Sequence, residues 1–296
     1  QTHHEHVLKA ASEYGAVLFS GFAIQTGEEW ASVLYKTSIK EMNYLGGAAV
    51  RNLIVGNNKR MNDLQVVTTN ESPPSEPILS TMSWPKHLSH HLIFASTVVL
   101  MTGGWLDTPS QIDFVYDYLH SKYPEFTEKI ERLGVKYIKI APEEDDASSA
   151  LGRSWKSMYA VTTRAEAEVE AAKQTTNLEW LENGDVKVIS NVLPAIRVSS
   201  NGNKVSLTNN AAYTGWIDKR NNPKKAVVFG DDTPLPDDVL TDLANYMKDN
   251  EVAYRWTPGR FVIVDNTVAY HSREPFFGKR ICYASIGNGT KPVTDT

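Results

Sequence analysis

The chain has 296 residues, of which 41% are hydrophobic and 22% charged, and its formal net charge is −5. It contains no run of about 18 apolar residues, so no membrane-spanning segment is predicted. Lys and Arg form no long block, which argues against nucleic acid and acidic membranes as partners. Its one cysteine, Cys282, excludes an intrachain disulfide and favours a reducing compartment, so we expect a cytoplasmic protein.

The first half of the chain mixes helices and strands. Thr26 and Glu29 have the spacing of a capping box, which begins a helix. Ser110 stands where it would cap a later helix, and Gly134 where it would end another. The predicted elements are a helix over 7–14, a strand over 15–21, a helix from Thr26 to about 38, a long loop over 56–77, a strand over 92–101, and helices over 110–119 and 125–133.

Beyond Gly134 the hydrophobic period changes to two. The segment Val135-Lys-Tyr-Ile-Lys-Ile-Ala141 alternates, and Asn183-Gly184 and Asn201-Gly202 are typical of hairpin turns. The further predicted elements are an amphipathic helix over 236–249 and strands over 260–271 and 280–286. Because strands and helices do not alternate as βαβ units, we predict one mixed domain, residues 1–296, built on an antiparallel sheet.

A set of short motifs between about residue 10 and residue 286 resembles the taurine dioxygenase (TauD/TfdA) family, in its clavaminate synthase-like branch. The motifs follow one another in the same order as in the family. Each motif alone is weak, whereas the ordered set is specific. The motifs are Gly15-Ala-Val-Leu-Phe19 with Gly21-Phe22, Gly46-Gly-Ala-Ala49, Thr69-Asn-Glu-Ser-Pro-Pro74, Gly152-Arg-Ser-Trp-Lys156, Ala212-Tyr-Thr-Gly-Trp216, Asp218-Lys-Arg-Asn221, Phe229-Gly-Asp231, Pro234-Leu-Pro236 and Asp265-Asn266 with His271-Ser-Arg273.

The resemblance implies a mainly β fold, with a double-stranded β-helix (jelly roll) core and flanking helices. It also implies an iron(II) held by two histidines and one carboxylate, with positions left open for 2-oxoglutarate and oxygen. In the family the first histidine and the acid come from a short His-x-Glu or His-x-Asp motif. The second histidine lies far downstream, before an arginine that anchors 2-oxoglutarate.

This chain matches that ligand pattern only in part. His271 stands at the downstream histidine, and Arg280 at the anchoring arginine. Counting back from the apolar run that begins at Leu92 places Leu79 at the first histidine and Thr81 at the carboxylate. Leucine cannot ligate a metal, and a threonine hydroxyl is a poor substitute for an anion. Trp105 replaces the acid of the family's Gly-Gly-Glu-Thr segment, so we expect no metal site.

Other residues are candidates for the wall of a substrate pocket, although each has a structural alternative. Aromatic residues more often fill cores, His271 would serve equally as a buried histidine, and Arg280 as half of a surface ion pair. The run Asp218–Asn221 is predicted to be a turn or surface network. A replacement metal site at His87, His90 and His91 is a weaker alternative, because neighbouring strand residues point to opposite faces. The predicted substrate-binding residues are Asn70, Ser72, Leu79, Thr81, Trp84, Trp105, Tyr213, Trp216 and Arg273.

Three functional hypotheses follow. The first is an enzyme of secondary metabolism that works without cofactors, with His271 and Arg280 as catalytic residues. Its reaction would be a non-redox step, such as cyclisation or isomerisation, on a small and largely apolar metabolite. The second is an iron(II)/2-oxoglutarate dioxygenase with atypical ligands, and the third is a non-catalytic binding protein derived from an oxygenase. The sequence leaves the substrate and the oligomeric state open.

Overall fold

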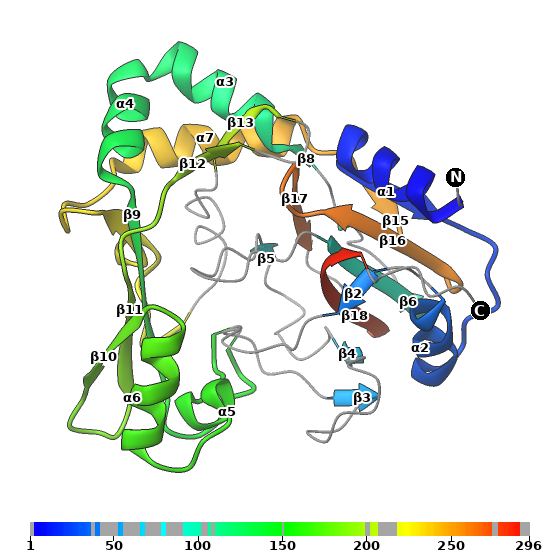
Figure 1. Cartoon of the computed structure of the whole chain (residues 1–296), viewed down its shortest axis with the longest axis horizontal. Coiled ribbons are helices and arrows are strands. Elements are labelled where there is room, and N and C mark those ends of the chain that lie inside the picture. Colours follow the sequence, from blue (N-terminus) through cyan, green and yellow to red (C-terminus); the bar gives the residue numbers. More distant parts are fainter. Residues whose placement is uncertain are drawn as a thin grey trace.

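The structure is a computed structural model, and Figure 1 shows the whole chain in it. The residues that it describes are 3–36, 39–41, 53–55, 66–68, 78–80, 91–101, 106–107, 110–149, 151–198, 202–206, 218–273 and 278–290. Among these residues, none of the helices combines the length and apolarity of a membrane-spanning segment.

Seven of the described strands form the largest sheet, in which every pairing is antiparallel. The side chains of Phe261, Ile263 and Tyr283 pack on one face of it, against helices α1 (His3–Tyr14) and α2 (Gly27–Tyr35). The strands, in spatial order, are β1 (Ala16–Phe19), β16 (Arg260–Asp265), β6 (His91–Met101), β18 (Gly278–Thr290), β4 (Val66–Thr68) and β3 (Leu53–Val55), with β2 (Ile39–Glu41) paired to β18.

A smaller antiparallel sheet contains β5 (Ile78–Ser80), β17 (Ala269–Arg273) and β8 (Ser110–Gln111), and a two-stranded ribbon joins β7 (Leu106–Asp107) to β15 (Tyr254–Arg255). Apolar side chains from β16, β17 and β18 meet in one buried cluster. These two antiparallel sheets with a shared apolar cluster form the predicted jelly roll core, and helices flank it (Figure 1).

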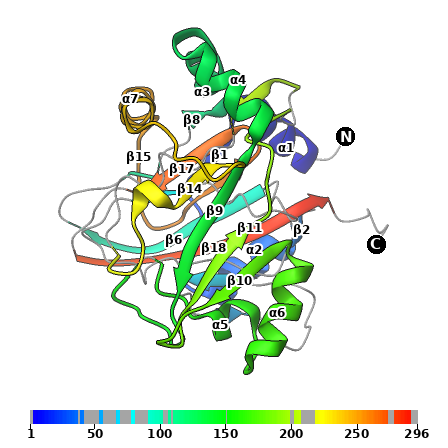
Figure 2. The ribbon, with the colours of Figure 1, turned by 90° about the vertical axis from the view of Figure 1, so that its left-hand side faces the viewer.

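A second group of strands lies beside the barrel. In Figure 2, β9, β11 and β10 run side by side as a twisted sheet. The sheet order is β10 (Thr176–Trp180), β11 (Val186–Ser190), β9 (Val135–Ala141) and β14 (Val227–Phe229). Helices α5 (Trp155–Tyr159) and α6 (Arg164–Lys173) cover one face of it through a buried cluster that includes Trp155, Val186 and Val188.

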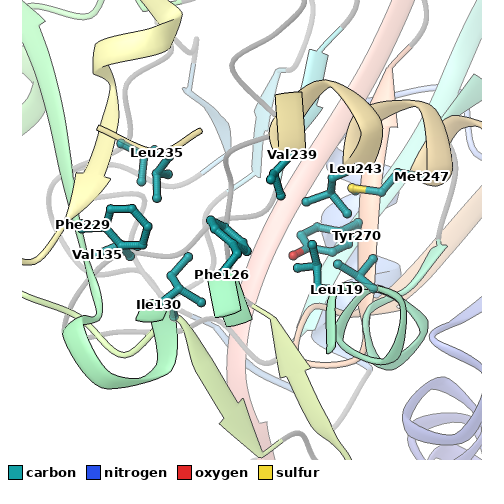
Figure 3. Packing of buried hydrophobic residues seen from close by; sticks show 13 residues of the cluster. Leu119, Phe126, Ile130, Val135, Phe229, Leu235, Val239, Leu243, Met247 and Tyr270 are labelled. Carbon is teal, nitrogen blue, oxygen red and sulfur yellow. The ribbon is translucent and has the colours of Figure 1, made fainter. Parts of the chain in front are cut away.

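The remaining helices pack where this sheet meets the barrel. They are α3 (Ile112–Lys122), α4 (Pro124–Leu133) and α7 (Asp237–Asp249). Three short elements complete the described part of the chain: β12 (Ile196–Val198), β13 (Lys204–Ser206), which pairs with β12, and the 3-10 helix η2 (Pro223–Lys225). Figure 3 shows the shared core of the three helices, in which Tyr270 of β17 packs among Leu119 of α3, Leu243 of α7 and their neighbours. This core therefore anchors the outer face of β17 to the helices.

Several sequence predictions are confirmed. Thr26 and Glu29 form the capping box of α2, with Glu29 N–H donating to Thr26 Oγ1 at 3.1 Å. Gly134 ends α4 with a φ of 65°, a conformation that favours glycine. The strand over 135–141 and the helix before residue 249 are present, and the predicted turn at Asn183-Gly184 joins an antiparallel pair. Asn201 of the second predicted turn lies outside the described residues, although β12 and β13 on either side of it pair antiparallel.

Four predictions are wrong in detail. Ser110 does not cap α3 but pairs with Tyr270 in β8. The strand predicted over 260–271 is two strands, separated by a turn at Asn266–Val268. The loop predicted over 56–77 contains β4, and the helix predicted over 7–14 begins already at residue 3. Pairing with a distant strand decides the structure at Ser110 and at β4.

Candidate functional site

A buried turn positions the strand that carries His271. Asp265 ends β16, and its carboxylate Oδ1 accepts hydrogen bonds from Thr267 N–H at 2.9 Å and from Thr267 Oγ1 at 2.6 Å. The Asp265 carbonyl accepts a further bond from Val268 N–H at 3.1 Å. Such side-chain bonds to the backbone two residues on are typical of Asp in turns. The chain therefore reverses here and enters β17 in a fixed direction.

Strand alternation then decides which side chains of β17 face the barrel. Tyr270 faces outward into the helical core, whereas Ala269 packs in the inner apolar cluster. His271 and Arg273 follow Ala269 at spacings of two and four residues, so they lie on the same face as Ala269. Both side chains are buried, with 9% of His271 and 8% of Arg273 exposed. His271 and Arg273, predicted as a catalytic and a substrate-binding residue, therefore share one buried strand face.

The inner cluster gives this face an apolar wall. Trp256 is 1% exposed and packs edge-on against Tyr254, with the ring centroids 5.2 Å apart. Trp256 was not predicted as a site residue, because its sequence neighbours, Arg255 and Thr257, give no periodic signal. The other buried members of the cluster are Val262, Val264, Ala269, Cys282 and Ile286. Cys282, which is 0% exposed, is accordingly a packing residue.

Burial determines the charge of His271. Desolvation lowers the pKa of its imidazole to about 4, because the charged form loses its hydration inside the barrel. The ring is therefore neutral at pH 7, with one nitrogen as donor and the other as acceptor. Arg273 keeps its charge at any pH at which the protein is folded. A neutral imidazole and a guanidinium on one strand face can orient a polar group of a bound molecule.

The strand next to β17 is the one that carries the predicted metal-ligand positions. In the antiparallel register, His271 pairs with Ser80, Ser272 with Leu79, and Arg273 with Ile78. Residues paired directly across such a ladder share a face, so the position that shares the face of His271 is Ser80, and not Leu79. Thr81 lies outside the described residues.

The donor set at this position does not fit an iron(II) held by two histidines and a carboxylate. Neither Leu79 nor Ser80 offers an imidazole or a carboxylate, whichever of them is taken as the first ligand position. Within the described part of the chain, no three His, Cys, Asp or Glu residues gather in a group that could hold a metal ion. Among the described residues of β5 and β17, His271 is thus the one that matches a metal ligand of the family.

Arg280 lies on the neighbouring wall of the barrel. It pairs with Val99 of β6 and stands two residues before Cys282, whose side chain is in the inner cluster. The register of β18 against β6 shifts between Ile281 and Cys282, so regular alternation does not extend from Cys282 to Arg280. The predicted residues Asn70, Ser72, Trp84, Trp105, Tyr213 and Trp216 lie outside the described residues, as do His87 and His90.

The Asp218–Asn221 run is a network, as predicted, but a buried one. The Asp218 side chain is 0% exposed, and Arg220 pairs with it at 2.8 Å and with Asp146 at 2.9 Å. Asn221 bonds the backbone of Ile140 in β9 with both ends of its amide. The run therefore joins the loop after β9 to the strand itself. It forms a turn, as predicted, with Asn221 N–H donating to the Asp218 carbonyl at 3.3 Å and with Lys219 exposed.

The fold and the His271 strand together define the jelly roll class of oxygenase-like proteins. A family model described as "Taurine catabolism dioxygenase TauD, TfdA family" matches residues 1–284. The chain belongs to this family.

Two relatives and two solved structures illustrate the range of similarity. A clavaminate synthase-like protein of Arabidopsis thaliana is 37% identical over 279 residues, which cover 93% of this chain and 82% of the relative. The dapdiamide synthesis protein DdaC of Enterobacter agglomerans is 21% identical, with coverages of 99% and 88%.

The solved structures support the fold alone, since their sequence identities are low. The structure of AAD-2 in complex with Mn(II) and N-oxalylglycine has a TM-score of 0.53 at 13% identity, over 98% of this chain and 90% of that one. A taurine dioxygenase from Burkholderia xenovorans has a TM-score of 0.51 at 11% identity, over 96% and 80%.

Proposed function

We propose that this chain is an enzyme that uses the oxygenase barrel without iron. The observation that supports the proposal is the pairing of His271 with β5, whose residues Leu79 and Ser80 offer neither an imidazole nor a carboxylate. A substrate of this barrel meets an apolar wall around Trp256 and a polar strand face with His271 and Arg273. A small and largely apolar metabolite suits such a surface.

The chemistry that these residues support is a non-redox rearrangement, such as cyclisation or isomerisation. An apolar wall holds a flexible substrate in one conformation, which lowers the entropic part of the barrier. Arg273 and, from β18, Arg280 stabilise negative charge that develops on a carbonyl or carboxylate in the transition state. With a pKa of about 4, His271 is a weak base at pH 7, so its part is to orient the substrate by hydrogen bonds or to relay a proton.

Family membership favours a second candidate, an iron(II)/2-oxoglutarate dioxygenase with ligands from other residues. A third candidate is a binding protein without catalysis. The three candidate functions predict different changes in mass between the precursor and the product. A rearrangement gives a product isomeric with its precursor, a dioxygenase reaction adds oxygen or removes hydrogen, and a binding protein leaves the metabolites unchanged.

Expression in a host with the neighbouring biosynthetic genes separates the candidates. We expect the wild-type chain to convert one metabolite into an isomer, and the His271→Gln and Arg273→Gln variants to lose most of that conversion. Phe114→Ala, at a half-exposed position on α3, is the matched control that keeps it. A product that differs by an oxygen atom would favour the dioxygenase, and an unchanged metabolite profile would favour the binding protein.

A further inference from the structure

Strand β1 is the last strand at one side of the largest sheet, and only one of its two edges is paired. Among the described strands, β1 pairs with β16 alone. Figure 1 shows α1 and β16 on the opposite side of the molecule from β9, β10 and β11. A terminal strand presents a row of backbone N–H and C=O groups, which can pair with a strand of another molecule.

The register of β1 decides which of its peptide groups point outward. Asp265 N–H donates to the Gly15 carbonyl at 2.9 Å, so these two residues form a hydrogen-bonded pair of the antiparallel ladder. Such pairs alternate along the ladder, and Val17 therefore bonds β16 as well. The N–H and C=O groups of Ala16 and Leu18 point away from β16. Both residues thus offer a donor and an acceptor at the outer edge.

The features that usually keep such an edge from pairing are missing from β1 and from the segment after it. Natural sheets protect an edge with Lys side chains, proline or a bulge. Residues 15–25 contain no charged residue and no proline, and β1 pairs with β16 in a regular register. Apolar and aromatic side chains near the edge are exposed instead, with 41% of Leu18, 44% of Phe22 and 65% of Tyr14 open to solvent.

We propose that β1 pairs antiparallel with β1 of a second copy of this chain, about a twofold axis at Val17. Ala16 N–H then donates to the Leu18 carbonyl of the second copy, and Leu18 N–H donates to its Ala16 carbonyl. Each bond occurs twice, because a twofold contact uses the same surface on both copies. Directly opposed residues share a face, so the small Ala16 side chain leaves room for the larger Leu18 of the second copy.

Helix α1 extends this contact beyond the two strands. Ala11 of α1 packs with Val17 and Phe19 on the helix-covered face of the sheet. A twofold axis perpendicular to the sheet keeps this face common to both copies, so it places the two α1 helices side by side and antiparallel. Strand pairing alone buries too little surface for a stable dimer, and the pair of helices adds to that surface.

The charges of α1 favour a second copy over a strand of an unrelated protein. The exposed residues Glu5, Lys9 and Glu13 follow one another at intervals of four, so alternating charges lie along one side of the helix. Between antiparallel helices, this pattern pairs Lys9 of each copy with an acidic residue of the other. Residues 15–25 add no like charges that would repel each other across the axis.

Sedimentation velocity and hydrogen exchange of single backbone amides, both on the full-length wild-type chain, test the proposal. Between about 1 and about 100 µM the mass should rise from that of a monomer to that of a dimer. The Ala16 and Leu18 amides should exchange freely in the monomer and at least about tenfold more slowly in the dimer. The Val17 amide is the internal control, because it bonds β16 in both states.

Three results of these wild-type measurements would overturn the proposal. One is a chain that stays monomeric at about 100 µM. Another is a dimer in which the Ala16 and Leu18 amides keep their monomer exchange rates. The third is slow exchange of both amides in the monomer, since another segment of the same chain would then cover the edge.

The variant Leu18→Pro tests the edge pairing separately. Because Leu18 N–H points away from β16, proline removes the outward donor and leaves the bonds between β1 and β16 intact. The loss of two hydrogen bonds per dimer should raise the dissociation constant at least about thirtyfold. Leu18→Val keeps the amide and is the matched control, with a dissociation constant within about threefold of the wild-type value. A Leu18→Pro dimer as tight as the wild-type dimer would overturn the pairing, and the wild-type exchange rates decide if this variant does not fold.

The variant Lys9→Glu tests the contact between the two α1 helices. Charge reversal should weaken the dimer several-fold at low salt and much less at about 0.5 M salt, where exposed charges are screened. A dissociation constant that is the same for Lys9→Glu and the wild type at low salt would overturn this part of the proposal.

Discussion

Asn221 continues the hydrogen bonding along the edge of β9 beyond the residues that pair with β14, and its removal should cost the protein about 3 kcal/mol of stability. The side chain is 8% exposed and makes three hydrogen bonds, two with the Ile140 backbone and one from Nδ2 to Asp218 Oδ1 at 2.9 Å. Each contributes roughly 1 kcal/mol net, and the backbone groups left without a partner add to the loss. We therefore expect Asn221→Ala to lower the free energy of unfolding by about 3 kcal/mol.

Urea unfolding followed by tryptophan fluorescence measures this loss. With an m-value of about 3 kcal/mol/M, the midpoint should fall by about 1 M. Asn191→Ala is the matched control, since Asn191 is exposed and accepts its bond from an exposed Asn177, so its effect should stay within about 0.5 kcal/mol. A loss below about 1 kcal/mol for Asn221→Ala would refute the idea that this amide completes the sheet.

Three further predictions concern the same elements and α2. Gly152→Ala should destabilise the chain by more than about 2 kcal/mol in urea unfolding, because its Cβ would meet the Asp146 carbonyl at 1.7 Å. Burial alone would raise the pKa of Asp218, but hydrogen bonds from Ser149, Arg220 and Asn221 outweigh it and lower that pKa. The ionised Asp218 carboxylate thus stabilises the fold at pH values above its pKa in the unfolded chain, about 4, and this stabilisation is lost as the pH falls through its pKa in the folded chain. Asp218→Asn should therefore destabilise the protein at pH 7 and much less at pH 3. Thr26→Ala should cost about 1 kcal/mol by removing the cap of α2, and an unchanged urea midpoint would contradict that.

The sequence predicts those parts of the fold that depend on local chemistry. The capping box at Thr26 and Glu29, the glycine end at Gly134 and the alternation along 135–141 each act within a few residues. The break inside 260–271 was missed because Val264 and Val268 continue the apolar pattern on either side of it. Its signal was Asp265-Asn-Thr267, in which Asp bonds the backbone two residues on.

The site shows the same division between local and distant causes. His271 and Arg273 were predicted as site residues from their match to a family motif, and their spacing of two places them on one face of β17. The register of that strand against β5 could not be predicted: the gap-free count from Leu92 placed Leu79 and Thr81 at the ligand positions, whereas in the structure His271 pairs with Ser80.

The most direct test of the account is metal binding by the purified wild-type chain, compared with the Leu79→His/Thr81→Glu variant. Calorimetric titration with Mn(II) and Fe(II) under anaerobic conditions, with and without 2-oxoglutarate, gives the affinities, and succinate release gives the turnover. The account predicts no stoichiometric binding and no succinate from the wild type. It predicts at least about a hundredfold tighter metal binding by the variant, roughly 2.7 kcal/mol. The variant Ser80→His/Met82→Glu tests the alternative register in the same way. Stoichiometric iron together with succinate release from the wild-type chain would contradict the account.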